Sequence, residues 1–180
     1  MYRLFPVMLL LFCACDGPRS ESASKPTNQP AVSLNTPSHL DHAQPKLRTM
    51  KLWLGPKEIN AELAVTETEV ATGMMFRKEM EETEGMLFIF GRPHRASFYM
   101  RNTYVPLSLA YIDSEGAILE IHDAKPLDET PIFARSEQVQ YVLEVKQGWF
   151  DRNGVRVGTV IRTEHGSFPE TFFRRGNDNL

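Results

Sequence analysis

The sequence predicts a mainly β fold of the α+β type, either a single compact antiparallel sheet or a small, partly closed barrel with one or two short helices. Three observations predict this class. About eight short segments have strand-like patterns, only one or two have helical signals, and turn residues separate them at short intervals. The chain has no internal repeat, heptad pattern or alternation of strands with long helices, so a doubly wound fold is disfavoured.

The first expected elements are a β-hairpin and a short helix. Residues 50–54 and 59–65 alternate between apolar and polar side chains, and Gly55-Pro56-Lys57 between them is typical of a turn. Thr66-Glu67-Thr68-Glu69 matches a capping box, in which the first threonine caps the helix and the second glutamate reaches back to its amide. The helix is expected from residue 67 to about residue 73.

Short strands and one helical turn make up the rest of the predicted domain. Residues 85–90 form an apolar run that is too short for a helix and is bounded by Gly91-Arg92-Pro93. The loop Asp113-Ser114-Glu115-Gly116 predicts a second hairpin, because its glycine can take a positive φ. A helical turn is expected at 148–154. The remaining strands are expected at 96–101, 107–112, 117–122, 141–145, 155–157 and 159–163.

Residues 1–14 have the pattern of a secretory signal peptide. Arg3 precedes an apolar run at 4–12, which is well short of the ~20 residues that span a bilayer. The sequence Phe12-Cys13-Ala14-Cys15 resembles a bacterial lipobox, in which the second cysteine is lipidated and becomes the mature N-terminus. We therefore expect a protein of the cell envelope that is lipid-anchored through Cys15, on the periplasmic side of the inner or the outer membrane.

Composition divides the rest of the chain into a tether, a domain and a tail. Residues 15–48 contain five prolines among small polar residues, so the segment after the lipidated cysteine is expected to be a disordered tether. A β-rich domain is expected at 49–165, followed by a loosely ordered tail at 166–180. Both cysteines of the chain precede this domain, which therefore contains no disulfide and no thiol nucleophile.

Charge and composition argue against nucleic acid and metal ions as partners. The formal net charge is −3, and the chain has no basic stripe that could follow a phosphate backbone. Five methionines fall within residues 74–100, and thioethers can bind Cu(I). Two of the five lie in apolar strand segments, however, where methionine fills gaps in a core. No metal and no cofactor are therefore expected.

One block of the chain, from residue 73 to residue 107, resembles part of a known family. It contains Gly73-Met74-Met75-Phe76-Arg77, Gly85-Met86-Leu87-Phe88, Phe98-Tyr99-Met100-Arg101-Asn102-Thr103 and Pro106-Leu107, and Tyr141-Val142-Leu143-Glu144-Val145 follows further on. These motifs resemble the bacterial and archaeal family called domain of unknown function 192 over residues 54–160. That family usually has an aspartate where this chain has Ser108. The resemblance implies a small β-rich domain, often behind a signal peptide, and no established activity.

The polar residues near this block form the candidate binding site. Two guanidinium groups with an amide between them suit a carboxylate or another planar anion. In the structural alternative, Arg77 pairs with a carboxylate such as Glu84 or Asp113, while Asn102 and Thr103 cap the turn before Pro106. The sequence leaves both interpretations open. The candidate binding residues are Arg77, Arg101, Asn102, Thr103 and Asp113.

The sequence favours a non-catalytic binding module of the cell envelope over an enzyme. His122 and Asp123 could form half of an acid–base pair, but no serine or cysteine lies in a nucleophile motif that they could activate. No catalytic residue is assigned. The expected partners are the membrane, through the lipid anchor, and an anionic small molecule or an envelope protein. The alternative is an envelope hydrolase that uses Arg101 and Asn102 to orient an anionic substrate.

Overall fold

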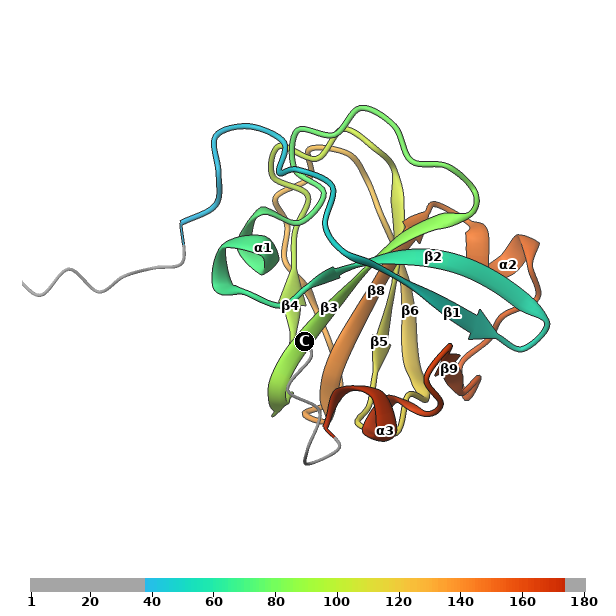
Figure 1. Ribbon diagram of the computed structural model, residues 1–180. Helices are drawn as coiled ribbons and strands as arrows, with labels where there is room; N and C mark the ends of the chain where they lie inside the picture. The colour runs from blue at the N-terminus through green and yellow to red at the C-terminus, as the bar shows by residue number, and fades with distance from the viewer. Residues whose placement is uncertain (1–37, 174–180) are drawn as a thin grey trace, which may run out of the picture. The chain divides into compact units, whose positions relative to one another are not determined.

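The computed structural model describes residues 38–173, whose strands form a curled sheet of seven strands and a small sheet of two (Figure 1). These residues belong to one compact unit. The strand order of the large sheet is β6-β5-β8-β3-β2-β1-β9. Its strands are β1 (Thr49–Leu54), β2 (Lys57–Ala64), β3 (Glu84–His94), β5 (Leu107–Ile112), β6 (Ile118–Ala124), β8 (Val139–Lys146) and β9 (Ile161–Thr163).

A small sheet and three short helices complete the fold. Strand β4 (Ser97–Phe98) pairs with β7 (Ile132–Phe133). In the view of Figure 1, α1 lies at the left beside β3 and β4, whereas α2, α3 and β9 lie at the right and lower edges of the sheet. The mainly β class that the sequence predicts is confirmed. The helices are α1 (Glu67–Thr72), α2 (Trp149–Arg152) and α3 (Phe168–Phe172).

Neighbouring strands of the large sheet are antiparallel except for β2 and β3, which are parallel. A parallel pair cannot be joined by a tight turn, because the connection must carry the chain back to the edge from which it started. Here the connection is residues 65–83, which include α1. This crossover brings Gly73 and the residues after it over one face of the sheet, against Phe88 of β3.

The two edges of the large sheet approach each other at one end, which gives it the form of a half-barrel. The Ile118 amide donates to the Thr159 carbonyl at 2.9 Å, and the Ile118 carbonyl accepts from the Gly158 amide at 2.8 Å. Gly116 makes this approach possible. Its φ is +85°, and a Cβ added there would lie 2.9 Å from the carbonyl oxygen of Ile161, so a side chain would separate the two edges.

The inner face of the half-barrel carries the larger hydrophobic core. Leu52 of β1, Ile118 of β6 and Ile161 of β9 belong to one buried cluster, although they come from opposite edges of the sheet. Helix α3 closes this core, because the ring of Phe168 lies 4.6 Å from the ring of Tyr141 on β8. Trp149 of α2 belongs to the same cluster. Burial of this face supplies much of the free energy that favours folding.

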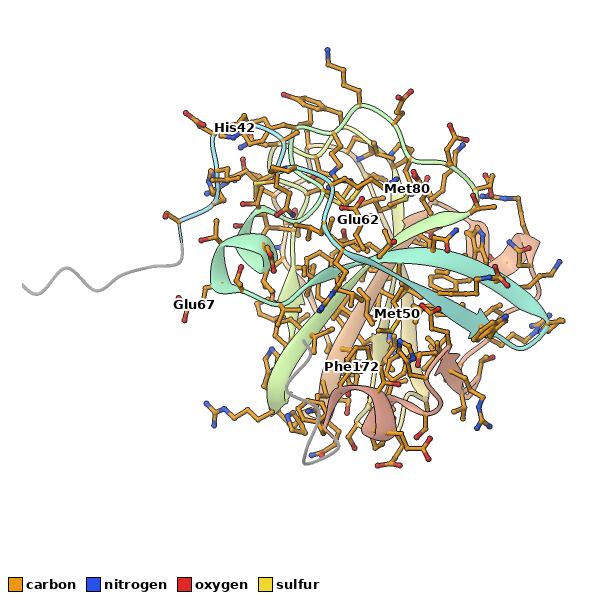
Figure 2. All side chains as sticks on the ribbon, in the orientation of Figure 1. His42, Met50, Glu62, Glu67, Met80 and Phe172 are labelled. Atoms are coloured by element: carbon orange, nitrogen blue, oxygen red, sulfur yellow. The ribbon has the colours of Figure 1, made fainter. Side chains whose placement is uncertain are left out.

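The outer face carries a second core, which irregular segments and α1 cover. From the sheet it includes Phe88 of β3 and Leu109 of β5. Figure 2 shows Met50 and Phe172, which belong to the inner core, on one side of β2 and Met80 of the outer core on the other. The residues that the covering segments contribute are Met74, Met80, Ala96, Met100, Val105 and Ala134.

Helix α1 begins at the predicted capping box. The Thr66 hydroxyl accepts from the Glu69 amide at 3.3 Å, and the Glu69 carboxylate accepts from the Thr66 amide at 2.9 Å. These two bonds satisfy amides that a helix start otherwise leaves without partners. The helix ends at Gly73, whose φ is +47°, so the predicted length is confirmed to within one residue.

The prediction of a loosely ordered tail at 166–180 is wrong for residues 167–172, which form a capped helix. Ser167 and Glu170 form a second capping box, and α3 follows it. Phe168 is fully buried and Phe172 is nearly so, because both rings pack against Tyr141. Residues 174–180 lie outside the described part of the chain.

The domain also begins earlier than the sequence predicts, because residues 38–48 pack on it. Gln44 is buried, and the Leu47 amide donates to the Glu62 carboxylate at 2.7 Å.

Two of the predicted strands differ in the structure. Within residues 96–101 only Ser97–Phe98 form a strand, and residues 155–157 do not form one. The signal peptide, Cys15 and the tether up to residue 37 lie outside the described residues.

Candidate functional site

A pocket of about 200 Å³ opens on the outer face, between the sheet and the segments that cover it. The end of α1 and Gly73-Met74-Met75 form one wall, and residues 97–99 with Thr103 form another. Strands β3 and β8 contribute the remainder, which includes Glu144. The lining is mostly apolar, as is usual for small-molecule sites.

Glu144 is the carboxylate of this pocket. It lies on the central strand β8, where its neighbours in register are Met86 of β3 and Leu109 of β5, both fully buried. Only 5% of Glu144 is exposed, and its Oε2 has no hydrogen-bond partner among the described residues.

Burial determines the protonation state of Glu144. Because burial disfavours the ionised form, it raises the pKa of Glu144 to about 8. The carboxyl group is therefore mostly neutral at pH 7.

Aromatic rings line the same pocket as Glu144. Phe88 and Phe98 meet edge to face, with ring centroids 4.9 Å apart, and Phe90 meets His94 in the same way at 4.5 Å. All four residues line the pocket. Edge-to-face pairs are favourable, so these rings hold one another in place around the pocket.

Gly73 explains how the wall formed by Gly73-Met74-Met75 can lie so close to the sheet. Its φ of +47° and ψ of −131° are typical of glycine alone. A Cβ at this position would lie 3.2 Å from the ring of Phe88. Glycine therefore lets the backbone pass directly over that ring, and Met74 and Met75 follow into buried positions.

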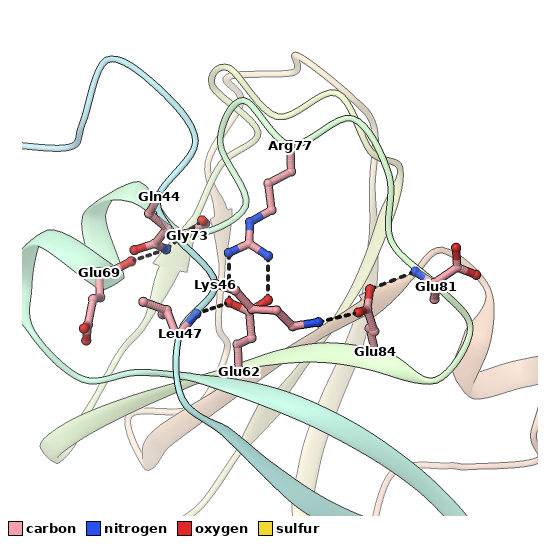
Figure 3. A network of polar contacts seen from close by, with 9 residues as sticks. All are labelled: Gln44, Lys46, Leu47, Glu62, Glu69, Gly73, Arg77, Glu81 and Glu84. Atoms are coloured by element: carbon pink, nitrogen blue, oxygen red, sulfur yellow. Dashed lines mark hydrogen bonds and ion pairs between the residues drawn. The ribbon is translucent and has the colours of Figure 1, made fainter.

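The N-terminal segment 38–48 fastens the same wall from outside (Figure 3). The Gln44 amide group donates to the carbonyl oxygens of Glu69 at 3.2 Å and Gly73 at 2.9 Å. The Leu40 amide donates to the Thr72 hydroxyl at 3.0 Å. The Glu69 carbonyl also accepts from the Gly73 amide within α1, so Gln44 adds a second donor there and ties the Gly73 carbonyl, just beyond the helix, to segment 38–48.

Arg77 is paired with Glu62 of β2, and not with Glu84 or Asp113. Two guanidinium nitrogens donate to the two Glu62 oxygens at 2.5 and 2.9 Å (Figure 3). The Arg77 side chain is 18% exposed and that of Glu62 is 8% exposed. A bidentate pair at this depth fixes the segment after Met75 to the sheet. Glu84 instead pairs with Lys46 at 2.9 Å.

Arg101 is paired with Glu129 at 2.8 Å in an exposed position. Its guanidinium group also lies over the ring of Tyr99, 5.4 Å from the centroid. Asn102 has a φ of +53°, and its carbonyl accepts from the Phe76 amide at 2.7 Å. The Thr103 hydroxyl donates to the Arg101 carbonyl at 3.1 Å, so both residues support the turn.

The five candidate residues of the sequence do not all lie together. Backbone contacts bring Phe76-Arg77 next to Asn102, and Thr103 lines the Glu144 pocket. Asp113 lies beyond the opposite end of β5, where its carboxylate accepts from the amides of Glu115 and Ala117 at 2.9 Å. Asp113 therefore shapes the β5–β6 hairpin.

Comparisons with known proteins identify the chain. The model of DUF192, an uncharacterised family described as "Uncharacterized ACR", matches residues 50–163. The chain belongs to the DUF192 family. A comparison with curated proteins gives no significant match.

Two solved structures share the DUF192 fold of this chain. One is a proposed transcription regulator from Sinorhizobium meliloti 1021, with 32% identity and a TM-score of 0.64, covering 67% of this chain and 97% of its own. The other is a protein of unknown function from Novosphingobium aromaticivorans DSM 12444, with 29% identity and a TM-score of 0.61. That match covers 82% of this chain and 99% of the other.

At Ser108, where the DUF192 resemblance predicts an aspartate, this chain supplies a carboxylate from the next strand. The Ser108 hydroxyl donates to Asp123, its partner in register on β6, and accepts from the Gly148 amide at 2.8 Å. His122 contacts Glu120 at 3.0 Å. His122 and Asp123 thus have separate partners. Within residues 38–173, no three His, Cys, Asp or Glu side chains gather where they could hold a metal ion.

Sequence reasoning did not single out Glu144 as a candidate site residue of this DUF192 chain. The available signal was a carboxylate inside Tyr141-Val142-Leu143-Glu144-Val145, a run that is otherwise apolar. A charged side chain in a strand that is buried on both faces needs a partner or a function.

Proposed function

We propose that this DUF192 protein is a non-catalytic ligand-binding module of the cell envelope, and that the Glu144 pocket is its binding site. The observation that supports it most directly is a buried carboxyl group with one oxygen left without a partner, at an apolar cavity. An unsatisfied buried polar group costs about 1–3 kcal/mol. A group kept at that expense of stability, in a pocket, is a candidate for ligand contact.

The residues that line the pocket do not suit an anionic ligand. Its lining includes no arginine or lysine, and an anion would meet Glu144 when this residue is ionised. Arg77 and Arg101 each have a carboxylate partner within the protein, so the envelope hydrolase alternative, which needs a free cationic cluster, has no comparable support.

The binding site can be tested with a fragment screen on the chain from residue 16 onward. Ser97 lies exposed at the pocket, so Ser97→Trp should fill its mouth. Lys57→Trp, at the exposed first residue of β2, is the matched control. Fragments that bind the pocket should raise the melting temperature of the parent chain and of Lys57→Trp, but not of Ser97→Trp. A library that shifts all three proteins equally, or shifts none, would contradict the proposal.

The envelope location rests on the lipobox and is tested separately. In residues 38–173, no helix has the length and apolar character needed to cross a bilayer. Cys15→Ser should release the protein into the soluble fraction of the envelope, because acyl chains contribute ~0.8 kcal/mol per buried CH₂ to membrane binding. Equal membrane retention of parent and variant after cell fractionation would show that Cys15 is not the anchor.

A further inference from the structure

The pocket lining combines groups that attract cations with an absence of cationic side chains. It contains the carboxyl group of Glu144, the rings of Phe88, Phe90, Phe98 and Tyr99, and the thioethers of Met74 and Met75, but no arginine or lysine. Aromatic faces attract cations through the ring quadrupole. A carboxylate beside them adds a full negative charge in a region of low dielectric constant.

We propose that the pocket binds a compact organic cation, such as a small quaternary or alkyl-ammonium group, with Glu144 as the counter-ion and the aromatic rings as walls. This inference rests on the proposed function and names the ligand class of the same site. The volume of about 200 Å³ lies below the usual range for drug-sized ligands, ~300–1,000 Å³. The cation is therefore a small one.

The geometry of the rings suits such a ligand. Phe88 and Phe98 both line the pocket and stand at 82° to each other, so they form aromatic walls of different orientation, and an aromatic surface attracts a cation. The guanidinium group of Arg101 lies over one face of the Tyr99 ring, so Tyr99 can offer only its other face to a ligand. The charge of Arg101 is balanced by Glu129, and Arg101 itself is not among the pocket residues.

Glu144 must ionise when it pairs with a cation, so binding should release a proton. Below pH ~8 the apparent affinity for a cation should rise by up to about tenfold per pH unit, and it should level off above that. The other titratable side chains that line the pocket are His94 at the end of β3 and Tyr99. Tyr111 on β5 interacts electrostatically with Glu144. Burial raises the pKa of Tyr111, so it stays neutral over this range.

Choline and its neutral isostere 3,3-dimethylbutan-1-ol are the probes that test the ligand class. They have similar shapes and differ in charge. Calorimetric titration of the chain from residue 16 onward, between pH 6 and pH 9, should show that choline binds more tightly and gains affinity as pH rises. Glu144→Gln should weaken choline binding at pH 8.5 by at least about tenfold, or ~1.4 kcal/mol, and should leave the isostere unchanged. His94→Gln should keep the pH dependence, which assigns it to Glu144.

The outcomes separate this inference from the proposed function. Equal or tighter binding of the neutral isostere, or choline affinity that is unaffected by pH and by Glu144→Gln, overturns the cation class and leaves a pocket for neutral ligands. If neither probe binds, the cation class is overturned as well, and the fragment screen on Ser97→Trp and Lys57→Trp decides the proposed function by itself. Circular dichroism of Glu144→Gln verifies that the variant is folded.

Discussion

The two faces of the curled sheet are both buried, but they are built differently. The inner face is filled by side chains of the strands and of α2 and α3, and the unpaired buried polar atom found there within residues 38–173 is the neutral hydroxyl of Tyr141. The outer face is covered by α1 and irregular segments, and it retains a carboxyl group and a pocket. We infer that the inner core mainly stabilises the fold, and that some stability of the outer core is given up for binding.

The largest change in stability is expected for a substitution in the inner core. Phe168→Ala should lower the free energy of unfolding by about 3–5 kcal/mol, because the ring is fully buried against Tyr141 and its loss leaves a cavity. Phe98→Ala on the outer face should cost less, about 1–2 kcal/mol, because that ring is only half-buried and already borders a pocket. Urea denaturation of the two variants measures the difference. Equal losses would show that the two faces contribute alike.

The next effect concerns the carboxyl group of the outer face. The folded pKa of Glu144 is about 8, well above its ordinary value of 4.5, so between these values the folded state binds the proton and the unfolded state does not. Stability should therefore fall as pH rises from about 5 to about 8, by ~3–4 kcal/mol, and stay level above. Chemical denaturation across this range is the measurement. Glu144→Gln should remove the slope, and a slope that persists in this variant would assign it to another group.

The smallest expected change in stability comes from breaking one of two ion pairs, Arg77–Glu62 or Arg101–Glu129. Arg77→Ala leaves Glu62 nearly buried without its bidentate partner and should cost about 2–4 kcal/mol. Arg101→Ala breaks an exposed pair and should leave the denaturation midpoint almost unchanged. If Arg101→Ala destabilises the fold as much as Arg77→Ala does, the exposed pair has a structural role that its exposure does not indicate.

Local signals in the sequence predicted much of the fold correctly. The hairpin of β1 and β2 and the start of α1 depend on residues within a few positions of one another, such as Thr66 and Glu69. Helix α3 was missed, although Ser167 and Glu170 form the same kind of capping box. Its phenylalanines are buried in the inner core, where they contact Tyr141, about 30 positions earlier, and local patterns do not report such contacts.

The candidate site was less predictable, because it depends on which face of the sheet each residue occupies. The partner of Arg77 is Glu62, and the parallel register of β2 and β3 sets the place of that residue. Glu144 points to the outer face because β8 pairs with β3 and β5 in one register, and a shift by one residue would turn it to the other face. Strand register is a long-range property that this sequence does not encode in adjacent residues.

The hydrogen bonds of segment 38–48 also determine how a mechanical load would enter the protein. A pull on the chain before residue 38 reaches Leu40–Thr72 and Gln44–Gly73 first, whereas β1 is held behind them by its ladders with β2 and β9. The hydrogen bonds to the pocket wall should therefore break before the strand pairing of β1 does. In a protein held through Cys15, tension would loosen the pocket before it strained the core.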